Sequence, residues 1–522
     1  MPCRAEAASE GWRHCASHLL FLSTILLAAC SNPSEETQTS SVEKPPAVSP
    51  SKPNVLLIAI DDMNDWTTLF DPDNPIQTPN LQRLAARGTF FNKAYCVSPA
   101  CNPSRTAILT GLHPSTTGVY GNKDSWRTLV PDAVTLPQYF TQNGYSTKGA
   151  GKIFHHGDAG KDRADNPSFQ EFFDMLATRA PDTNHNGYTE GLLAKTVFDW
   201  GVHDKKIIDL DTVEWVEHEM DQPSEKPRFM AAGIFRPHMP FYSDQVTYDK
   251  YPYESLVMPS YKENDLDDVG TIAKNMAQKE FFITDNVLGK PERDPGSLHT
   301  FVKSYQAASD YADQMVGRLL DKLDATGEAD NTIIILFSDH GYHLGDKESC
   351  VKFTLWEKAN HVPFIIVAPG ITKPGTICGQ PVSLLDIYPT LVDLCALPLK
   401  EDIDGRSLIP LLKDPQSTWE QPALMTMGRG NHAIRSERWR YIRYSDGTEE
   451  LYDHDNDPWE WDNLLAHHSL QGGGGASVPQ YATVIAEHKT WLPKQEVPWQ
   501  IDESKNWIYA REIWDDTPTN EK

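Results

Sequence analysis

Charged and imidazole side chains follow four segments of this chain that we expect to be strands, three of which are continuous apolar runs. They are Asp61 and Asp62 after NVLLIAI, Asp339 and His340 after TIIILF, Arg236 and His238 after FMAAGIF, and Lys152 and His155 after YSTKGA. Continuous apolar runs are typical of parallel strands buried on both faces, and open α/β sheets carry their sites at the carboxyl ends of their strands. One acidic pair after a strand is often only a helix N-cap. Four such groups together predict a site at one edge of a sheet.

The carboxylates among these groups indicate a hard divalent cation. Asp61, Asp62 and Asp339 offer oxygen ligands, which favour calcium or magnesium over zinc, and His340 lies beside them. The 522-residue chain holds 47 Lys and Arg against 73 Asp and Glu, a formal charge of −26. This charge argues against nucleic acid and anionic lipid as binding partners. An anionic small substrate remains compatible with it, because a cation and a few basic side chains can reverse the field inside one pocket.

Cys101 opens the segment CNPSRTAILTG, which predicts a short helix. Pro103 suits a first helical turn, and Gly111 is a stop signal. A helix N-terminus favours anions, and Arg105 lies one turn further along, so it points back toward Cys101. From the residues alone, Cys101 is either a buried, inert cysteine or a thiolate nucleophile of the Cys-His type. A calcium or magnesium site does not call for a thiolate ligand.

The sequence Cys-x-Pro-Ser-Arg followed by TAILTG resembles the signature of the type I sulfatases, which have the alkaline-phosphatase-like fold. Four further segments resemble family motifs in the same order: IAIDDMNDW, GKIFHHG, RPHMPF and FSDHGYHLGDKESCVKFTLWEKANHVPFIIVAPG. ELYDHDNDPWEWDNL resembles the C-terminal strand and turn of the family. Within the family, DDMND and the pair Asp339-His340 are most similar to the iduronate-2-sulfatase branch. The resemblance covers roughly residues 53 to 465.

The resemblance implies that Cys101 is converted to formylglycine (3-oxoalanine) by a maturase before export, and that its hydrated aldehyde attacks sulfur. It implies a metal ion, calcium rather than magnesium, held by Asp61, Asp62, residue 101, Asp339 and His340. It also implies the catalytic roles that follow. Arg105 steadies the hydrated aldehyde, Lys152 and Lys352 bind sulfate oxygens, His238 protonates the leaving sugar oxygen, and His155 takes the proton from the remaining hydroxyl of the hydrate.

The expected activity is the hydrolysis of a sulfate ester on an oligosaccharide derived from a polysaccharide. We expect an exo-acting enzyme, with a 2-O-sulfated uronic acid or an algal glycan as the sugar. Two alternatives stay open: a phosphodiesterase or phosphonate monoester hydrolase of the same fold, and a lipoprotein that binds sulfated glycans without turnover. Among the basic residues of the second metal motif, Lys347 and Lys358 are competitors for the role given to Lys352.

The elements that must position these groups predict an α/β fold. Apolar strands alternate with helical segments such as SYQAASDYADQMVGRLLDKLDATG, so we expect a large, mostly parallel sheet between helices. After about residue 400 the pattern alternates, with a hairpin signal at Asp446-Gly447, which predicts a smaller antiparallel sheet. The predicted organisation is a lipoprotein signal peptide (1–30), a disordered tether (31–52), a sulfatase catalytic domain (53–400) and a C-terminal subdomain (401–522).

The first residues predict export. LLFLSTILLAAC is too short to span a bilayer, fits a signal-peptide apolar region and ends in a lipobox-like LAAC. Cys30 would then carry a lipid anchor, and the mature protein would lie in the periplasm or on the outer membrane. Cys96, Cys101, Cys350, Cys378 and Cys395 do not form a dense disulfide framework, and their pairing stays open.

The remaining basic and aromatic residues have two interpretations each. His432 and arginines 429, 435, 438, 440 and 443 lie on the C-terminal sheet, where alternating arginines usually form a solvated face. One or two of them would instead contact an anionic sugar at the rim of the pocket. The tryptophans of the tail either pack over the core or stack on sugar rings. We expect His156, His343 and His361 to be structural or surface residues.

Overall fold

The computed structural model describes residues 52–155, 165, 167–174, 199–203, 206–278, 294, 296–466 and 478–500. The predicted signal peptide, Cys30, nearly all of the tether and His156 lie outside these residues. No helix within the described ranges combines the length and apolar character needed to cross a membrane. All five cysteines in the described ranges are buried thiols, so none of them forms a disulfide.

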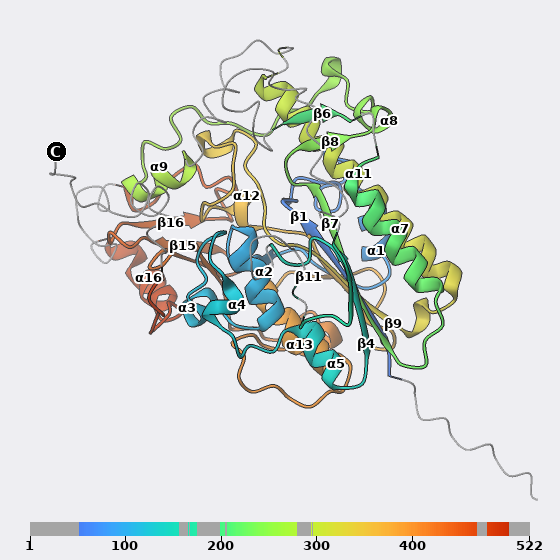
Figure 1. Ribbon diagram of the computed structural model, residues 1–522. Coiled ribbons are helices and arrows are strands. Elements are labelled where there is room, and N and C mark those ends of the chain that lie inside the picture. Colours follow the sequence, from blue (N-terminus) through green and yellow to red (C-terminus); the bar gives the residue numbers. More distant parts are fainter. Residues whose placement is uncertain are drawn as a thin grey trace, which may run out of the picture. The chain divides into compact units, whose positions relative to one another are not determined.

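An eight-stranded sheet carries the chemistry-bearing strand ends (Figure 1). Its order is β11 (Thr376–Cys378), β2 (Thr89–Phe91), β10 (Phe364–Val367), β9 (Thr332–Ser338), β1 (Asn54–Asp61), β7 (Arg228–Pro237), β4 (Ser146–Gly151) and β5 (Glu171–Phe173). Strand β1 pairs in parallel with both β7 and β9, and β4 pairs in parallel with β7 and β5. Strand β10 runs antiparallel to β9 and β2. The sheet is therefore mixed, with the expected parallel strands at its centre.

Side chains alternate between the two faces of β1, and each set packs against a different layer of helices. Leu56 and Ile58 join a core with residues of α1 (Pro79–Ala85), α7 (Ile208–Asp221) and α11 (Leu298–Thr326). The opposite face packs against α2 (Cys101–Thr110), α5 (Leu136–Gln142) and α13 (Ile387–Leu394). Figure 1 shows these two groups of helices on either side of the sheet. Burial of both faces explains why the strands are apolar throughout.

A four-stranded antiparallel sheet follows the large sheet in the chain. It has the order β13 (Ala423–Thr426), β14 (His432–Arg435), β15 (Trp439–Arg443) and β16 (Glu449–Asp453). The predicted turn joins β15 to β16, where Gly447 has a φ of 88°. One face packs on α16 (Ala482–Lys489), and the other joins the main core through residues such as Ala433 and Ile442. The boundary near residue 400 stays a prediction.

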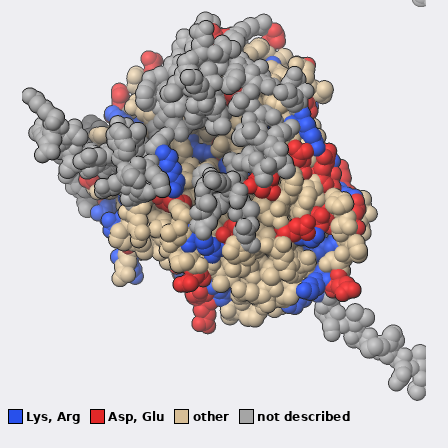
Figure 2. All heavy atoms as spheres, viewed as in Figure 1, with Lys and Arg blue, Asp and Glu red and all other residues tan. Residues whose placement is uncertain are grey.

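Shorter elements complete the described chain. They are β3 (Ala94–Tyr95), α3 (Pro114–Thr117), α4 (Trp126–Leu129), β6 (Trp200–Val202), β8 (Phe241–Ser243), α8 (Gln245–Tyr248), α9 (Thr271–Ala277), α12 (Glu357–Asn360), β12 (Val382–Ser383) and α14 (Ile409–Lys413). On the face drawn in Figure 2, acidic side chains gather over α7, whose sequence IDLDTVEWVEHEMD is rich in them. Part of the excess of acidic residues in the sequence thus lies on this surface.

Candidate active site

Two neighbouring strands of the main sheet end at the same point and carry carboxylates there. Asp61 is the last residue of β1, and Asp339 directly follows β9. The amide of Asp339 donates to the carbonyl of Ile60 at 3.0 Å, which extends the contact between the two strands. Asp62 has a φ of 67°, a left-handed conformation that is uncommon outside glycine. Its amide donates to Asp339 Oδ1 at 3.3 Å, so three carboxyl-bearing residues meet at one edge.

Helix α2 begins at Cys101, with its N-terminus against these carboxylates. All ten of its residues are buried, and it ends at Gly111, which has a φ of 72°. Arg105 Nε donates to Asp339 Oδ2 at 2.7 Å, and Arg105 Nη2 lies 3.6 Å from Asp61 Oδ1. The helix expected from CNPSRTAILTG is therefore present, and one arginine joins it to both strand ends.

Polar side chains surround the sulfur of Cys101, whose exposed fraction is 0%. Its neighbours are Lys352 Nζ at 3.1 Å, His340 Nε2 at 3.2 Å, Lys152 Nζ at 3.6 Å, Asp61 Oδ1 at 3.7 Å, and His155, which hydrogen-bonds the thiol. His340 Nδ1 donates to the carbonyl of Gly341 at 3.0 Å, which leaves Nε2 directed at the sulfur. The structure thus brings these predicted site residues together around residue 101.

The field at this position stabilises negative charge. Burial alone would raise the pKa of the Cys101 thiol, but Lys152, Lys352 and His340 lower it well below its usual range. Lys352 is held in place by Asp62, whose Oδ1 lies 2.7 Å from its Nζ. The cationic side chains therefore stabilise negative charge on residue 101 and on an anion bound beside it. Such charge-assisted contacts are strong in a buried site.

The donor set fits a hard divalent cation. Ligand atoms of Asp61, Cys101, Asp339 and His340 lie within 4.8 Å of one another, as do those of Asp61, Asp62, Cys101 and His238. Burial raises the pKa of Asp339 to about 7, with a further contribution from the nearby Asp61 and against the effect of Arg105. A cation would remove this repulsion, and carboxylate oxygens are the ligands that calcium and magnesium prefer.

Lys152 reaches the site from the end of β4, across a glycine of the neighbouring strand. Its amide donates to the carbonyl of Gly233 at 3.0 Å, and a Cβ at Gly233 would lie only 2.3 Å from the backbone carbon of Lys152. Glycine is therefore required at this point of β7. The ammonium of Lys152 is fully buried and forms an ion pair with Asp61.

His238 follows β7, at a point where the pairing of β7 with β1 shifts. Ile60 pairs with Ile234, but Asp61 pairs with Pro237, so β7 has two additional residues before His238. The Nδ1 atom donates to the carbonyl of Met239 at 2.6 Å, which directs Nε2 away from that bond. The imidazole is partly exposed, unlike Cys101, and is therefore accessible to a substrate at the edge of the site.

Only one of the three candidate lysines lies beside Cys101. Lys347 Nζ is 3.1 Å from Asp265 Oδ1, and Lys358 Nζ is 2.8 Å from Asp65 Oδ1. Lys352 is thus the member of this set positioned to contact a group bound at residue 101. Of the three histidines expected to be structural or surface residues, the structure describes His343 and His361, and both have polar partners outside the site. His343 contacts Asp346 and Thr354, and His361 contacts Asp65 and the carbonyl of Asn92.

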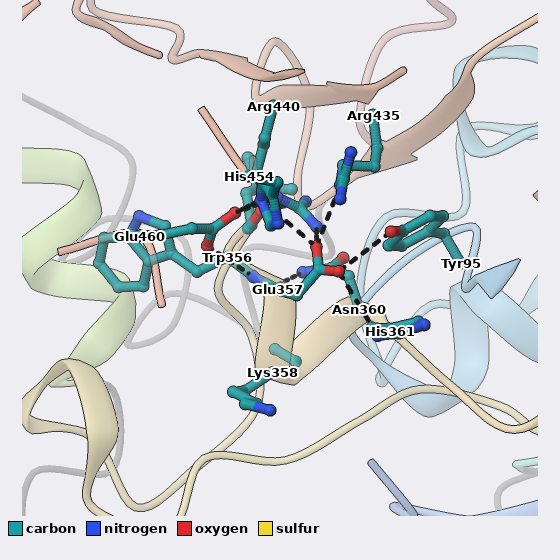
Figure 3. Close-up of polar contacts among 12 residues, drawn as sticks. Tyr95, Trp356, Glu357, Lys358, Asn360, His361, Arg435, Arg440, His454 and Glu460 are labelled. Atoms are coloured by element: carbon teal, nitrogen blue, oxygen red, sulfur yellow. Dashed lines mark hydrogen bonds and ion pairs between the residues drawn. The ribbon is translucent and has the colours of Figure 1, made fainter. Parts of the chain in front are cut away.

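Arg435 and Arg440 correct the expected solvated face of the C-terminal sheet. Their exposed fractions are 3% and 0%, and both guanidinium groups form ion pairs with Glu357 of α12 (Figure 3). Arg440 also pairs with Glu460, and His454 Nε2 lies 2.8 Å from Glu460 Oε1. The alternation of the strand is present, but α12 covers this face. The cluster joins the small sheet to the segment that carries Lys352.

Two serines support the site without having been singled out in the sequence. Ser104 Oγ donates to the carbonyl of Asp339 at 2.6 Å. Ser338 Oγ accepts from the amide of Met63 at 2.9 Å and donates to the carbonyl of His340 at 3.0 Å. The sequence signal for Ser338 was its position directly before Asp339, because serine hydroxyls beside irregular backbone commonly hydrogen-bond the polar groups of that backbone.

Residues 53–396 match the family model described as Sulfatase. The chain belongs to the sulfatase family. This sulfatase also matches, over residues 345–472, the model described as N-sulphoglucosamine sulphohydrolase, C-terminal. Family membership and the named relatives make it a sulfuric ester hydrolase, as the signature around Cys101 predicted.

Curated relatives extend over most of the chain. A sulfatase of Formosa agariphila is 35% identical over 477 residues, covering 86% of this chain and 88% of the relative. Human iduronate 2-sulfatase is 29% identical (73% of this chain, 74% of the relative), and an ulvan-active sulfatase of Formosa agariphila is 28% identical (80% and 78%).

Solved structures share the fold. One protein in complex with its substrate D-glucosamine-2-N,6-O-disulfate has a TM-score of 0.67 at 20% identity, covering 90% of this chain and 100% of that one. A phosphonate monoester hydrolase from Silicibacter pomeroyi has a TM-score of 0.66 at 22% identity, covering 84% and 95%. At these identities the likeness shows the alkaline-phosphatase-like fold alone.

Proposed function

We propose that this sulfatase removes a sulfate ester from a sulfated oligosaccharide, with formylglycine at position 101 and calcium at the carboxylates. The observation that carries the proposal is the convergence of Lys152, Lys352 and His340 on the side chain of residue 101. The relatives include enzymes named for iduronate 2-sulfate and for ulvan, which supports a sulfated glycan as substrate. We further propose that the enzyme is exo-acting and that its sugar is a 2-O-sulfated uronic acid or an algal sugar.

Each side chain has a task that its position supports. The hydrated aldehyde would supply a hydroxyl nucleophile with a second hydroxyl for release of sulfate, and calcium would supply charge neutralisation at the sulfate oxygens. Lys152 and Lys352 bind the sulfate oxygens and stabilise the charge that develops there. Arg105 holds residue 101 at the strand ends.

Two histidines carry the proton transfers of the proposed reaction. His238 Nε2 donates a proton to the departing sugar oxygen, a role for which the partly exposed imidazole at the edge of the site is placed. His155, a hydrogen-bond partner of residue 101, accepts the proton from the remaining hydroxyl. A different histidine would thus serve each half of the reaction.

The test is sulfate release by enzyme coexpressed with a formylglycine-generating maturase, with the state of residue 101 measured by peptide mass. The panel contains a 2-O-sulfated uronate disaccharide, a 6-O-sulfated glucosamine, an ulvan oligosaccharide, and nitrophenyl sulfate, phosphate and phosphonate esters. We expect release from a sulfated sugar, loss of at least 1,000-fold in Cys101→Ala, and retained activity in the matched buried-thiol control Cys96→Ala. Turnover of the phosphorus esters alone, by protein carrying the aldehyde, would overturn the proposal in favour of the phosphohydrolase alternative.

We also propose that the chain is exported and anchored by a lipid on Cys30. The support is the sequence alone, through the apolar run that ends in LAAC. Labelled palmitate should be incorporated by the native host protein and not by Cys30→Ala. Equal labelling of both would refute the anchor.

A further inference from the structure

A cavity of about 560 Å³ lies at the C-terminal sheet, apart from the residues that surround Cys101. Its lining includes Arg429, His432, Arg443, Tyr444, Glu496 and Trp499. The cavity thus combines cationic side chains with aromatic ones. This combination suits a sugar that carries an anionic group, since aromatic rings pack on the apolar face of the sugar ring and guanidinium groups bind carboxylate or sulfate.

The two arginines of this cavity differ from the other three of the sheet. Arg435 and Arg440 pair with Glu357, and Arg438 pairs with Asp453 in two hydrogen bonds. Within the described ranges, the guanidinium groups of Arg429 and Arg443 have neither a hydrogen bond nor a carboxylate within 4 Å. Three of the arginines therefore have carboxylate partners, and two leave their charge available at the cavity.

The acidic residue of the lining does not cancel this charge. Glu496 Oε1 lies 3.1 Å from His432 Nε2 and accepts from the amide of Gly430 at 3.1 Å. Burial would raise the pKa of Glu496, but His432, the amide of Gly430 and the charge of Arg429 lower it below its usual value, so the carboxylate is ionised. The lining therefore brings two guanidinium charges, of Arg429 and Arg443, against the single carboxylate of Glu496.

Trp499 connects the cavity to the start of α2. Its Nε1 donates to the carboxylate of Asp124 at 3.1 Å, and its ring lies on Gly121, where a Cβ would be 3.2 Å away. On the other side of the same turn, the side chain of Asn102 donates to the carbonyls of Gly121 and Asp124, both at 2.9 Å. Asn102 is the residue directly after Cys101. One turn therefore contacts both the wall of the cavity and the reactive end of the helix.

We propose that this cavity is a second subsite, which binds the carboxylate or sulfate of a sugar unit away from the ester that is cleaved. The proposal rests on the proposed function, because it takes a sulfated glycan as the substrate. Arg429 and Arg443 would bind the anionic group and Trp499 would pack on the ring. The subsite would make the enzyme favour oligosaccharides over monosaccharides.

The experiment compares three variants, Arg429→Gln, Arg443→Gln and the double variant, with the wild type. Arg438→Gln is the matched control, because the guanidinium of Arg438 pairs with Asp453 and not with the cavity. The probes are a heparin-derived tetrasaccharide, an ulvan oligosaccharide and nitrophenyl sulfate. For the oligosaccharide that the wild type desulfates, we expect KM to rise about tenfold for each arginine removed, with kcat unchanged. The loss on nitrophenyl sulfate should be at least tenfold smaller, and Arg438→Gln should match the wild type on both substrates.

A binding measurement tests the subsite directly, and two kinetic outcomes separate failure of the subsite from failure of the proposed function. The Kd of a Cys101→Ala protein for the same oligosaccharide should lose part of its salt dependence in the double variant, because two charge contacts are removed. Equal KM and kcat of wild type and double variant on the sulfated oligosaccharide that the wild type desulfates would overturn the subsite and leave the proposed function intact. Absence of glycan desulfation by enzyme with the aldehyde, alongside phosphoester turnover, would overturn both.

Discussion

Glu357 offers the sharpest test of how the small sheet is held against the segment that carries Lys352. Its carboxylate receives Arg440, Arg435 Nε at 3.4 Å and the hydroxyl of Tyr95 at 3.0 Å (Figure 3). Burial would raise the pKa of Glu357, but Arg435, His454 and Arg440 hold it well below its usual value. The carboxylate is therefore ionised, and Glu357→Gln leaves two buried guanidinium groups without their shared counter-ion.

The expected loss follows from that burial. Removing one partner of a buried ion pair costs about 3–5 kcal/mol. Arg438→Gln is the matched control, because Arg438 is 45% exposed and exposed ion pairs contribute little to stability. Urea unfolding, followed by tryptophan fluorescence and extrapolated with a common slope, should place Glu357→Gln at least about 2 kcal/mol below Arg438→Gln.

A double-mutant cycle separates the ion pair from general damage. Glu357→Gln combined with Arg435→Met removes both charges, so the double variant should lose less than the two single variants do together. Strict additivity, or a Glu357→Gln protein as stable as Arg438→Gln, would refute the view that this cluster holds the small sheet in place.

Three further predictions concern the site and the same sheet. His238→Ala should slow the hydrolysis of sugar sulfates more than that of nitrophenyl sulfate, whose leaving group needs no acid; equal losses in kcat would exclude His238 as the acid. Removal of metal by a chelator should lower the melting temperature, and added calcium should restore it, because calcium at 100 Kd stabilises the folded state by about 2.7 kcal/mol; an unchanged melting curve in metal-depleted protein would count against the site. Burial raises the pKa of Glu450 from 4.5 to about 7 despite hydrogen bonds from Trp356 and Tyr452. The folded state thus binds this proton more tightly, and the associated stability is complete below about pH 4.5 and is lost as the pH rises through about 7. In Glu450→Gln the free energy of unfolding should lack this part of the pH-dependent loss, which is on the order of 3 kcal/mol. Parallel curves of unfolding free energy against pH for the two proteins would disprove the role of Glu450.

The side chains at the strand ends were predictable, because they directly follow apolar runs that can be recognised in the sequence. The run at residues 54–60 predicted β1, and the residues that follow it meet those that follow β9 because the two strands are parallel neighbours. Direction of pairing is a different property. VPFIIVAPG is as apolar as the parallel strands, yet β10 runs antiparallel, since nothing in a buried run specifies the direction of its neighbour.

The partners of charged residues were the least predictable part. Alternation on β14 and β15 shows that Arg435 and Arg440 share a face, but not that a helix covers it. Their counter-ion Glu357 lies 78 and 83 residues away in the sequence. The same limit applied to Lys347, Lys352 and Lys358, which lie in one short segment and have three different surroundings.

The spacing of the site along the chain has a consequence for synthesis. Arg105 and Asp339, joined directly in the folded protein, are 234 residues apart, and β1 lacks its neighbour β9 until residue 338 has been made. At about 5–20 residues per second, that interval lasts about 10–50 seconds. During this time the segment around Cys101, sealed to 0% exposure once the sheet closes, is still open to a modifying enzyme. The order of the strands thus gives a timed opportunity for chemistry on this cysteine, and that opportunity ends when folding is complete.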